Sequence, residues 1–400
     1  MQELAESHLP LGFRFSAGRA GIRKHGGDDL ALMLSERPAT AAGVFTRNCV
    51  RAAPVELSAR ALRESGGTAR VIVANAGNAN CATPNQAAVA KATAEAAAAL
   101  AGVPRHQVLV ASTGVIGEPF AEEVIPDALP GLWRSLDRAQ FEACAKAIMT
   151  TDTVPKARRA SFEVGGRTAR VAGMAKGAGM IMPDMATMLS FLFTDADVSP
   201  GHLRKALQLA VGRSFNCITV DSDTSTNDTV LLLANGASGV TVEDRADSAT
   251  AFSEALGGLT QALAIDIARD GEGASKLARI AVQGAQSETA ARRIAMAIAN
   301  SPLVKTAIAG ADPNWGRILA AAGKSGQPFR PDDADISING TQVCSGGMRA
   351  DFEEAPVQRA MESDSVEIEF RLRGDGLGQA AVWTCDLTEG YVRINADYRT

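Results

Sequence analysis

The chain has 400 residues, a formal net charge of −5 and a hydrophobic share of 46%. That length is sufficient for two domains, or for one large layered unit with a substantial core. The acidic balance argues against a broad surface for nucleic acid or for a membrane, and neither a secretory signal nor a membrane-spanning apolar run is visible, so we expect a cytoplasmic protein.

The first third of the chain alternates short apolar runs with turn residues. The runs predict strands at 30–35, 41–46, 71–75 and 108–112. An alanine-rich segment predicts a helix from Gln86 to Leu100 that ends at Gly102. The strand at 108–112 leads into Thr113-Gly-Val-Ile-Gly117, a turn with exposed backbone N–H groups.

The middle of the chain mixes both kinds of element. A helix is expected at 141–149, followed by Thr150-Thr-Asp-Thr153. Strands are expected at 170–174, 189–194, 217–220 and 230–233. Ser199 and Pro200 suit the N-cap and first turn of a helix that continues to Val211.

The last third predicts helices at 252–268 and 290–299 and strands at 277–282, 335–338 and 366–370. Several neighbouring strands are hairpin-like and no regular βαβ alternation appears. This pattern favours an α+β fold built in layers over a doubly wound sheet.

The stretch Lys176-Gly-Ala-Gly-Met-Ile-Met-Pro-Asp-Met-Ala-Thr-Met-Leu189 runs from a glycine-rich loop into a buried strand. We hypothesise that the protein cuts its own Ala186–Thr187 bond, so that Thr187 becomes an N-terminal nucleophile. The freed α-amino group, with a pKa of roughly 7.7–8.0 in model peptides, can accept the proton of the hydroxyl on the same residue. The alternative is that Thr187 is an ordinary strand residue after a glycine loop.

Thr113 and Gly114 suit an oxyanion hole, because a Thr hydroxyl and a Gly N–H at a strand end can point at one oxygen. Taken alone, the pair is equally compatible with a plain turn.

Other catalytic motifs are missing. There is no G-x-S-x-G elbow, and the four His form no H-E-x-x-H motif. The six Cys form no C-x-x-C pair and have no nearby His, so we expect buried reduced thiols and no metal site.

Asp221-Ser-Asp-Thr-Ser225 approaches the nucleophile loop of haloacid-dehalogenase-like phosphotransferases. A polar Asx-type turn is the alternative for this segment, and an EF-hand fails because loop position six is Thr226.

Taken together, these segments resemble one family in order along nearly the whole chain: the glutamate N-acetyltransferase / ornithine acetyltransferase family of arginine biosynthesis, the ArgJ family. The segments that carry the resemblance are 75–80, 112–117, 147–153, 176–181, 185–189, 221–229, 270–274, 300–306, 312–317 and 385–400.

The resemblance implies a layered α/β/β/α-type sandwich of the self-cleaving DmpA/ArgJ-like fold. Cleavage between Ala186 and Thr187 would give an α chain, 1–186, and a β chain, 187–400, which stay associated as one composite unit. An α2β2 heterotetramer or larger assembly is expected by the same analogy.

The implied reaction is a ping-pong acetyl transfer. Thr187 takes the acetyl group of N2-acetyl-L-ornithine, releases L-ornithine, and passes the acetyl group to L-glutamate. No metal or tightly bound cofactor is implied. Acetyl-CoA is a further possible donor, and the sequence does not separate a monofunctional from a bifunctional enzyme.

The resemblance also implies the site residues. Thr113 and Gly114 match the oxyanion pair, and the substrate-contacting positions are Thr150, Lys176, Thr187, Glu272, Asn395 and Thr400. We expect the Lys176 cation to serve a substrate carboxylate and the Glu272 anion to serve the distal ammonium of ornithine.

Three other readings remain open at this point. One is a self-cleaving N-terminal-nucleophile aminopeptidase or amidase, although its nucleophile is usually Ser. Another is an uncut, non-enzymatic binding protein for amino acids. The third is a phosphotransferase that depends on Asp221 and magnesium.

Overall fold

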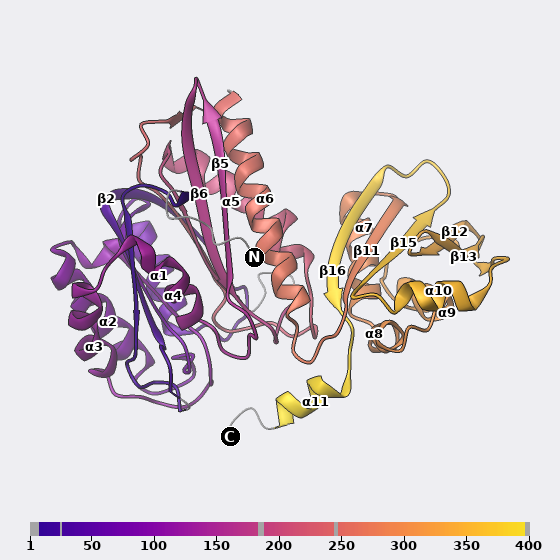
Figure 1. The fold of residues 1–400 in the computed structure, drawn as a ribbon, viewed down its shortest axis with the longest axis horizontal. Helices are drawn as coiled ribbons and strands as arrows, with labels where there is room; N and C mark the ends of the chain where they lie inside the picture. Colours follow the sequence, from indigo (N-terminus) through magenta and orange to yellow (C-terminus); the bar gives the residue numbers. More distant parts are fainter. Residues whose placement is uncertain (1–7, 25, 183–187, 244–246, 397–400) are drawn as a thin grey trace. The chain divides into compact units, whose positions relative to one another are not determined.

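The computed structural model describes residues 8–24, 26–182, 188–243 and 247–396. The chain divides into two compact units, each with its own sheet, and each unit is described by itself (Figure 1). Unit 1 consists of Met1–Gly177, Asp184–Asn216 and Asp223–Ile267. Unit 2 consists of Ala178–Pro183, Cys217–Ser222 and Ala268–Thr400.

Unit 1 is built on an eight-stranded sheet of order β4-β3-β2-β9-β7-β6-β5, in which β1 also pairs with β2. The β3–β4 and β7–β9 pairs are parallel, and the other pairs are antiparallel. The strands are β1 (Phe13–Gly18), β2 (Leu30–Phe45), β3 (Thr68–Asn75), β4 (Val108–Ser112), β5 (Lys156–Val164), β6 (Arg167–Lys176), β7 (Leu189–Thr194) and β9 (Thr229–Ala234).

The sheet of unit 1 folds over into two facing layers, and the long strand β2 takes part in both. Its first half pairs with β1, and its second half pairs with β9. Phe13 and Phe15 of β1 contact Phe193 of β7, with ring centroids 5.1 Å and 5.2 Å apart. Because side chains alternate across each strand, the faces that carry these rings enclose one core, which also holds Phe141 and Phe191.

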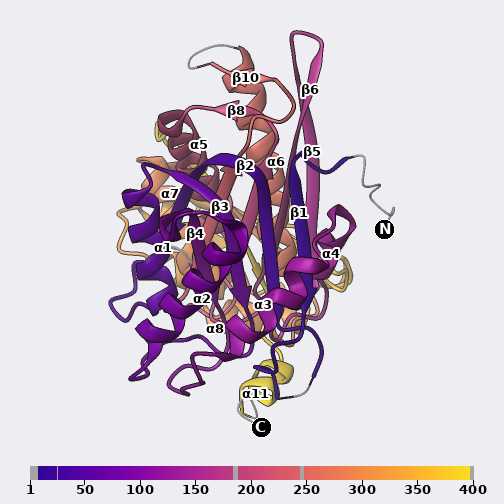
Figure 2. The same cartoon turned by 90° about the vertical axis from the view of Figure 1, so that its left-hand side faces the viewer.

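Helices cover the outer sides of these layers. Small and aliphatic residues of α2 and α3 pack on the side chains of β2, β3 and β4 that point away from the phenylalanine core (Figure 2). On the other side, Phe252 of α6 packs against Phe162 of β5. This is the layered α+β sandwich that the sequence predicts. The helices of unit 1 are α1 (Ala53–Glu64), α2 (Gln86–Ala101), α3 (Val124–Arg134), α4 (Phe141–Ala147), α5 (Pro200–Arg213) and α6 (Asp247–Arg269), of which α6 ends in unit 2.

Unit 2 has a six-stranded sheet of order β14-β13-β12-β15-β11-β16, with only the β11–β15 pair parallel. Helix α7 packs its buried alanines and isoleucines on this sheet. The elements are β11 (Leu277–Ala285), α7 (Glu288–Ala299), α8 (Pro302–Ala309), α9 (Trp315–Gly323), β12 (Ala334–Ile338), β13 (Thr341–Ser345), β14 (Met348–Arg349), α10 (Glu354–Met361), β15 (Ser365–Leu372), β16 (Gly378–Cys385) and α11 (Glu389–Ala396).

Most predicted elements are confirmed, and the sharpest agreement is at helix ends. Gly102 follows α2 in the left-handed conformation, with φ +62°, which glycine adopts without strain. The Ser199 side chain accepts a hydrogen bond from the N–H of His202 at the start of α5.

Three expectations are wrong. Residues 217–220 form no strand: a 3-10 turn ends at Cys217, and only an isolated bridge links Ile218 to Trp383. The strands expected at 30–35 and 41–46 form one continuous strand, β2. It tolerates Pro38, which has no backbone N–H to donate, because the β2–β3 ladder is interrupted there. Finally, Cys49 is exposed, whereas the other five Cys are buried and all six are free thiols.

The strands on either side of residues 183–187 belong to the same sheet. Strand β6 pairs with β7 from Lys176↔Leu189 to Val171↔Thr194. The predicted α and β chains would therefore share unit 1, and cleavage itself stays a prediction. No helix in the described ranges is both long and apolar enough to cross a bilayer.

Phe193→Ala should lower the free energy of unfolding by about 3–5 kcal/mol, because it leaves a void among buried rings. Urea denaturation measures this change. The matched control is Leu209→Ala on α5, where the side chain is exposed, and its effect should stay within about 0.5 kcal/mol. Equal effects of the two substitutions would contradict the placement of the core.

Candidate active site

The turn after β4 presents two hydrogen-bond donors, the Thr113 hydroxyl and the Gly114 N–H. The Thr113 N–H donates to the Asn75 carbonyl oxygen at 3.0 Å, which fixes the turn. Gly114 has φ +132°, and a Cβ on it would lie 2.3 Å from the carbonyl carbon of Gly77, so only glycine fits. Within the described ranges, the Gly114 N–H donates to no acceptor. It remains available to an oxygen outside the backbone, as an oxyanion hole requires.

Lys176, at the end of β6, joins this turn to a second threonine. Its Nζ donates to Thr113 Oγ1 at 3.3 Å and to Thr150 Oγ1 at 2.7 Å, and the residue is only 3% exposed. Since an ammonium group can only donate, both hydroxyl oxygens act as acceptors here. The Thr113 hydroxyl proton can then be donated to the same oxygen as the Gly114 N–H.

Asp152 is the anion that organises this cluster. Its Oδ1 accepts from Lys156 Nζ and from the Gly177 N–H, both at 2.7 Å, and its Oδ2 accepts from the Thr150 N–H at 3.0 Å. Burial alone would raise the pKa of Asp152, but the charges of Lys176 and Lys156 and these hydrogen bonds outweigh burial and lower it to about 2. Asp152 is therefore ionised at neutral pH.

Arg23 fixes the segment that carries Thr150. Its guanidinium donates to the carbonyl oxygens of Ala147, at 3.2 Å, and of Met149. Burial lowers the pKa of Arg23, and the nearby carboxylates of Asp29 and Asp152 partly restore it. The end of α4 is thus held beside the lysine cluster.

The local charge balance favours an anionic ligand or transition state. Among the groups that set the pKa of Asp152, Lys176 and Lys156 bring two positive charges beside its single negative charge. A second carboxyl group that interacts with Lys176 is that of Asp228, and burial raises its pKa well above the usual range. An oxygen that becomes negative beside Thr113 would be stabilised by this excess charge.

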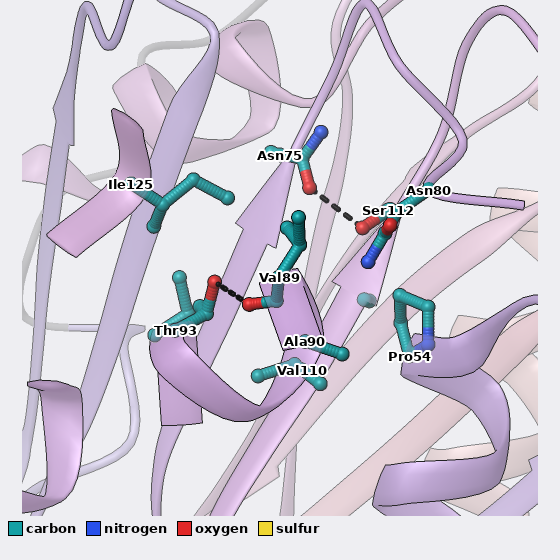
Figure 3. A pocket seen from close by; sticks show the side chains of 11 residues that line it. Pro54, Asn75, Asn80, Val89, Ala90, Thr93, Val110, Ser112 and Ile125 are labelled. Atoms are coloured by element: carbon teal, nitrogen blue, oxygen red, sulfur yellow. Dashed lines mark hydrogen bonds between the residues drawn. The ribbon is translucent and has the colours of Figure 1, made fainter. Parts of the chain in front are cut away.

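A small cavity of about 10 Å³ lies between the strands β3 and β4 and the helices α1, α2 and α3 (Figure 3). Its wall includes Asn75 and Ser112, and the Ser112 hydroxyl donates to Asn75 Oδ1 at 2.6 Å. Room for about one water molecule cannot hold a substrate.

Glu272 and Asn395 lie together in unit 2. Asn395 Nδ2 donates to Glu272 Oε2 at 2.7 Å, and Glu272 is 8% exposed. A Cβ on Gly179 would lie 2.3–2.5 Å from the Glu272 carboxylate, so glycine makes room for this acid. The Glu272 N–H donates to the Ala178 carbonyl oxygen at 2.8 Å, which ties the acid to the glycine-rich loop.

Asp221 serves the same loop. Its carboxylate accepts from the N–H groups of Met180 and Ile181, at 2.5 Å and 2.9 Å, and from the Tyr391 hydroxyl at 3.2 Å. Through these contacts, Asp221 links the glycine-rich loop to α11. They occupy both carboxylate oxygens, which does not favour a phosphoryl-accepting nucleophile.

The described site residues therefore fall into two groups, one in each unit. Thr113, Gly114, Thr150 and Lys176 form the first, and Glu272 with Asn395 forms the second. Ala186, Thr187 and Thr400 lie outside the described residues. Across the described ranges, no three His, Cys, Asp or Glu side chains are grouped to hold a metal ion.

Comparison with known proteins decides the family, because the family model described as "ArgJ family" matches residues 14–400. The chain belongs to the ArgJ family. It is 46% identical over 403 residues to the arginine biosynthesis bifunctional protein ArgJ of Rhizobium meliloti. The aligned region covers 99% of this chain and 97% of that protein. The ArgJ protein of Chlorobaculum tepidum is 47% identical over 396 residues, with 98% and 96% covered.

A solved ArgJ structure agrees. The crystal structure of arginine biosynthesis bifunctional protein ArgJ from Bacillus halodurans is 43% identical, with a TM-score of 0.51. It covers 52% of this chain and 99% of its own. The chain solved there is therefore about half as long as this one.

Asp152→Asn should reduce stability in a pH-dependent way. The lowered pKa means that the carboxylate contributes stability above about pH 4, and that this contribution is lost as the pH falls through about 2. Relative to wild type, the variant should lose about 2 kcal/mol at pH 7. In urea titrations this difference should stay constant down to about pH 5 and shrink as the pH falls from about 4 toward 2.

Glu163→Gln on β5 is the control, because that carboxylate is exposed. A pH-independent difference between Asp152→Asn and wild type would show that the Asp152 charge is not what stabilises the cluster.

Proposed function

We propose that this chain transfers the acetyl group of N2-acetyl-L-ornithine to L-glutamate through an acetyl-Thr187 intermediate. The products are L-ornithine and N-acetyl-L-glutamate, intermediates of arginine biosynthesis. The observation that carries the proposal is the ArgJ family match across residues 14–400. Because that match includes every proposed site residue, the activity is assigned to the chain as a whole.

The contacts around Thr113 support the acetyl-transfer step. The Thr187 hydroxyl attacks the acetyl carbonyl carbon, and its proton passes to the Thr187 α-amine. The carbonyl oxygen becomes negative and is met by the Thr113 hydroxyl and the Gly114 N–H, with the charge of Lys176 behind them. Collapse of this intermediate releases ornithine, whose nitrogen takes the proton back, and glutamate repeats the steps in reverse order.

Charge complementarity supports the substrate assignment. The excess positive charge around Lys176 suits the carboxylate shared by acetylornithine and glutamate. Glu272 suits the distal ammonium group of ornithine, and Asn395 orients its carboxylate. Thr150 and the C-terminal Thr400 complete the proposed substrate contacts.

We also propose that Thr187 is freed by cleavage of the Ala186–Thr187 bond and that the two pieces remain paired through β6 and β7. The half-length chain of the Bacillus halodurans relative is in keeping with such a cut. We infer a cytoplasmic location and an assembly of α2β2 or larger.

The proposed cycle uses no metal or resident cofactor. The curated relatives are named bifunctional, and for this chain we propose N-acetylglutamate synthesis from acetyl-CoA as the second activity. CoA release from acetyl-CoA and glutamate, compared with ornithine release from acetylornithine and glutamate, separates the two activities. An aminopeptidase or amidase would instead release free acid without any acceptor amino acid.

Thr187→Ala should remain one chain of about 41.5 kDa and should have no acetyl-transfer activity, because the alanine side chain has no hydroxyl. Intact-mass measurement and N-terminal sequencing provide the test. Wild type should yield two pieces, one beginning at Thr187. Thr187→Ser is the matched control, because it keeps the hydroxyl, and it should still be cut. An alanine variant that is cut or active would refute the assignment.

Glu272→Gln should weaken the half-reaction with acetylornithine while leaving the reaction with glutamate nearly intact. Losing one charged contact should raise KM for acetylornithine about tenfold or more. Steady-state kinetics with each substrate varied measure this split. Glu389→Gln on α11, whose side chain is 91% exposed, is the control. If Glu272→Gln left the acetylornithine half-reaction unchanged, the ammonium assignment would be wrong.

A further inference from the structure

The loop before β9 carries two consecutive buried side chains, Asn227 and Asp228, which bind backbone groups at the end of β4 and directly before β7. Asn227 Nδ2 donates to the carbonyl oxygens of Ala79, at 2.6 Å, and Ser112, at 2.9 Å. Asp228 Oδ1 accepts from the Met188 N–H at 2.9 Å. The two residues are 5% and 1% exposed, so neither side chain is placed to exchange these partners for solvent.

The backbone groups they hold adjoin the reacting residues. The Ser112 carbonyl belongs to the peptide group that joins Ser112 to Thr113. The Met188 nitrogen is bonded directly to the carbonyl carbon of Thr187. Met188 is held on its other side as well, because its carbonyl oxygen accepts from the Thr229 N–H at 3.1 Å. One short loop therefore fixes the strand end before Thr113 and the first residue after Thr187.

The carboxyl group of Asp228 is an unusual choice for this task. Full burial raises its pKa well above the usual range, and the Met188 N–H, the Lys176 charge and Thr46 offset that rise only partly. Within the described ranges, its Oδ2 is buried without a hydrogen-bond partner. A buried carboxylate with so few donors would be costly, which favours the uncharged acid as the form that holds Met188.

We propose that Asn227 and Asp228 are positioning residues that set the separation between Thr187 and the oxyanion donors Thr113 and Gly114, with Asp228 acting in its uncharged form. This inference rests on the proposed function. It adds two residues that act through backbone groups and touch no substrate.

Asn235, at the other end of β9, provides a matched control. Its Nδ2 also donates to two carbonyl oxygens, those of Leu11 at 2.9 Å and Gly12 at 3.1 Å, and it is 6% exposed. It performs the same structural task as Asn227 at a distance from the reacting groups. A comparison of the two separates positioning from stability.

The test measures kcat and KM for acetylornithine, the half-time of self-cleavage and Tm. Asn227→Ala and Asp228→Ala should lower kcat about 10²-fold, because a misplacement of about 1 Å can cost that much, while KM changes little. Asn235→Ala should lower Tm by as much as Asn227→Ala but keep its kcat. Self-cleavage should slow in the first two variants and not in the third.

Asp228→Asn tests the uncharged form. The amide keeps the shape and the acceptor oxygen but cannot ionise, so it should recover kcat and self-cleavage to within about tenfold of wild type, with an unchanged pH profile of kcat. If Asp228→Asn is as slow as Asp228→Ala, an ionising or proton-donating group is required and the inference fails. It also fails if Asn227→Ala retains the kcat of Asn235→Ala.

Two further outcomes are separable. If an alanine variant does not fold, Asn227→Ser and Asp228→Asn carry the same comparison, and wild-type kcat in Asn227→Ser would overturn the inference. If wild type itself transfers no acetyl group, the proposed function fails and the inference falls with it. If wild type is active and the Asn227 and Asp228 variants match the control, only the positioning inference is lost.

Discussion

Lys176 is only 3% exposed, so its positive charge must be balanced within the protein. In unit 1, the carboxylate of Asp152 contributes the opposite charge. Within the described ranges, the carboxyl groups of Asp152 and Asp228 both interact with this ammonium group, and their surroundings shift their pKa values in opposite directions. Asp152 accepts from several donors and its pKa is lowered, whereas Asp228 accepts from the Met188 N–H and burial raises its pKa well above the usual range. Carboxyl groups whose environments push their pKa values apart are typical of sites that carry out acid–base chemistry. The rest of the site depends on this split, because an ionised Asp228 would cancel the positive charge available to an oxyanion.

The fold explains how such distant residues meet. Strand β2 takes part in both layers, so β4 with its Thr113 turn and β7 with Met188 at its start belong to one unit. Their separation is then set by the phenylalanine-rich core between the layers and by the short loop before β9. Packing at that core resists small displacements, which suits a reaction in which donors and nucleophile must be correctly spaced.

Much of this organisation could be predicted from the sequence, because the signals were local. Gly102 ends α2 by its left-handed backbone, and Ser199 with Pro200 begins α5, and each needs only near neighbours. The site could be predicted in part because the resemblance to a family supplied Thr113, Gly114 and Lys176. Asp152 and Asn227 were missed as site residues. Their partners lie 25 residues away for Gly177 and 115 for Ser112, and no local pattern reports a hydrogen bond across such distances.

The antiparallel pairing of β6 with β7 has a consequence for how this protein can be made. Both strands must be in place before the proposed cut for the pieces to remain joined by that ladder. Folding of the intact precursor is a reaction of one molecule with itself, whereas renaturation of two separated pieces requires a collision, and its rate depends on their concentration. A mature molecule that is pulled apart would therefore have no quick way back, and its persistence would be kinetic. Synthesis as one polypeptide would supply the assembly step that the finished two-piece protein no longer has.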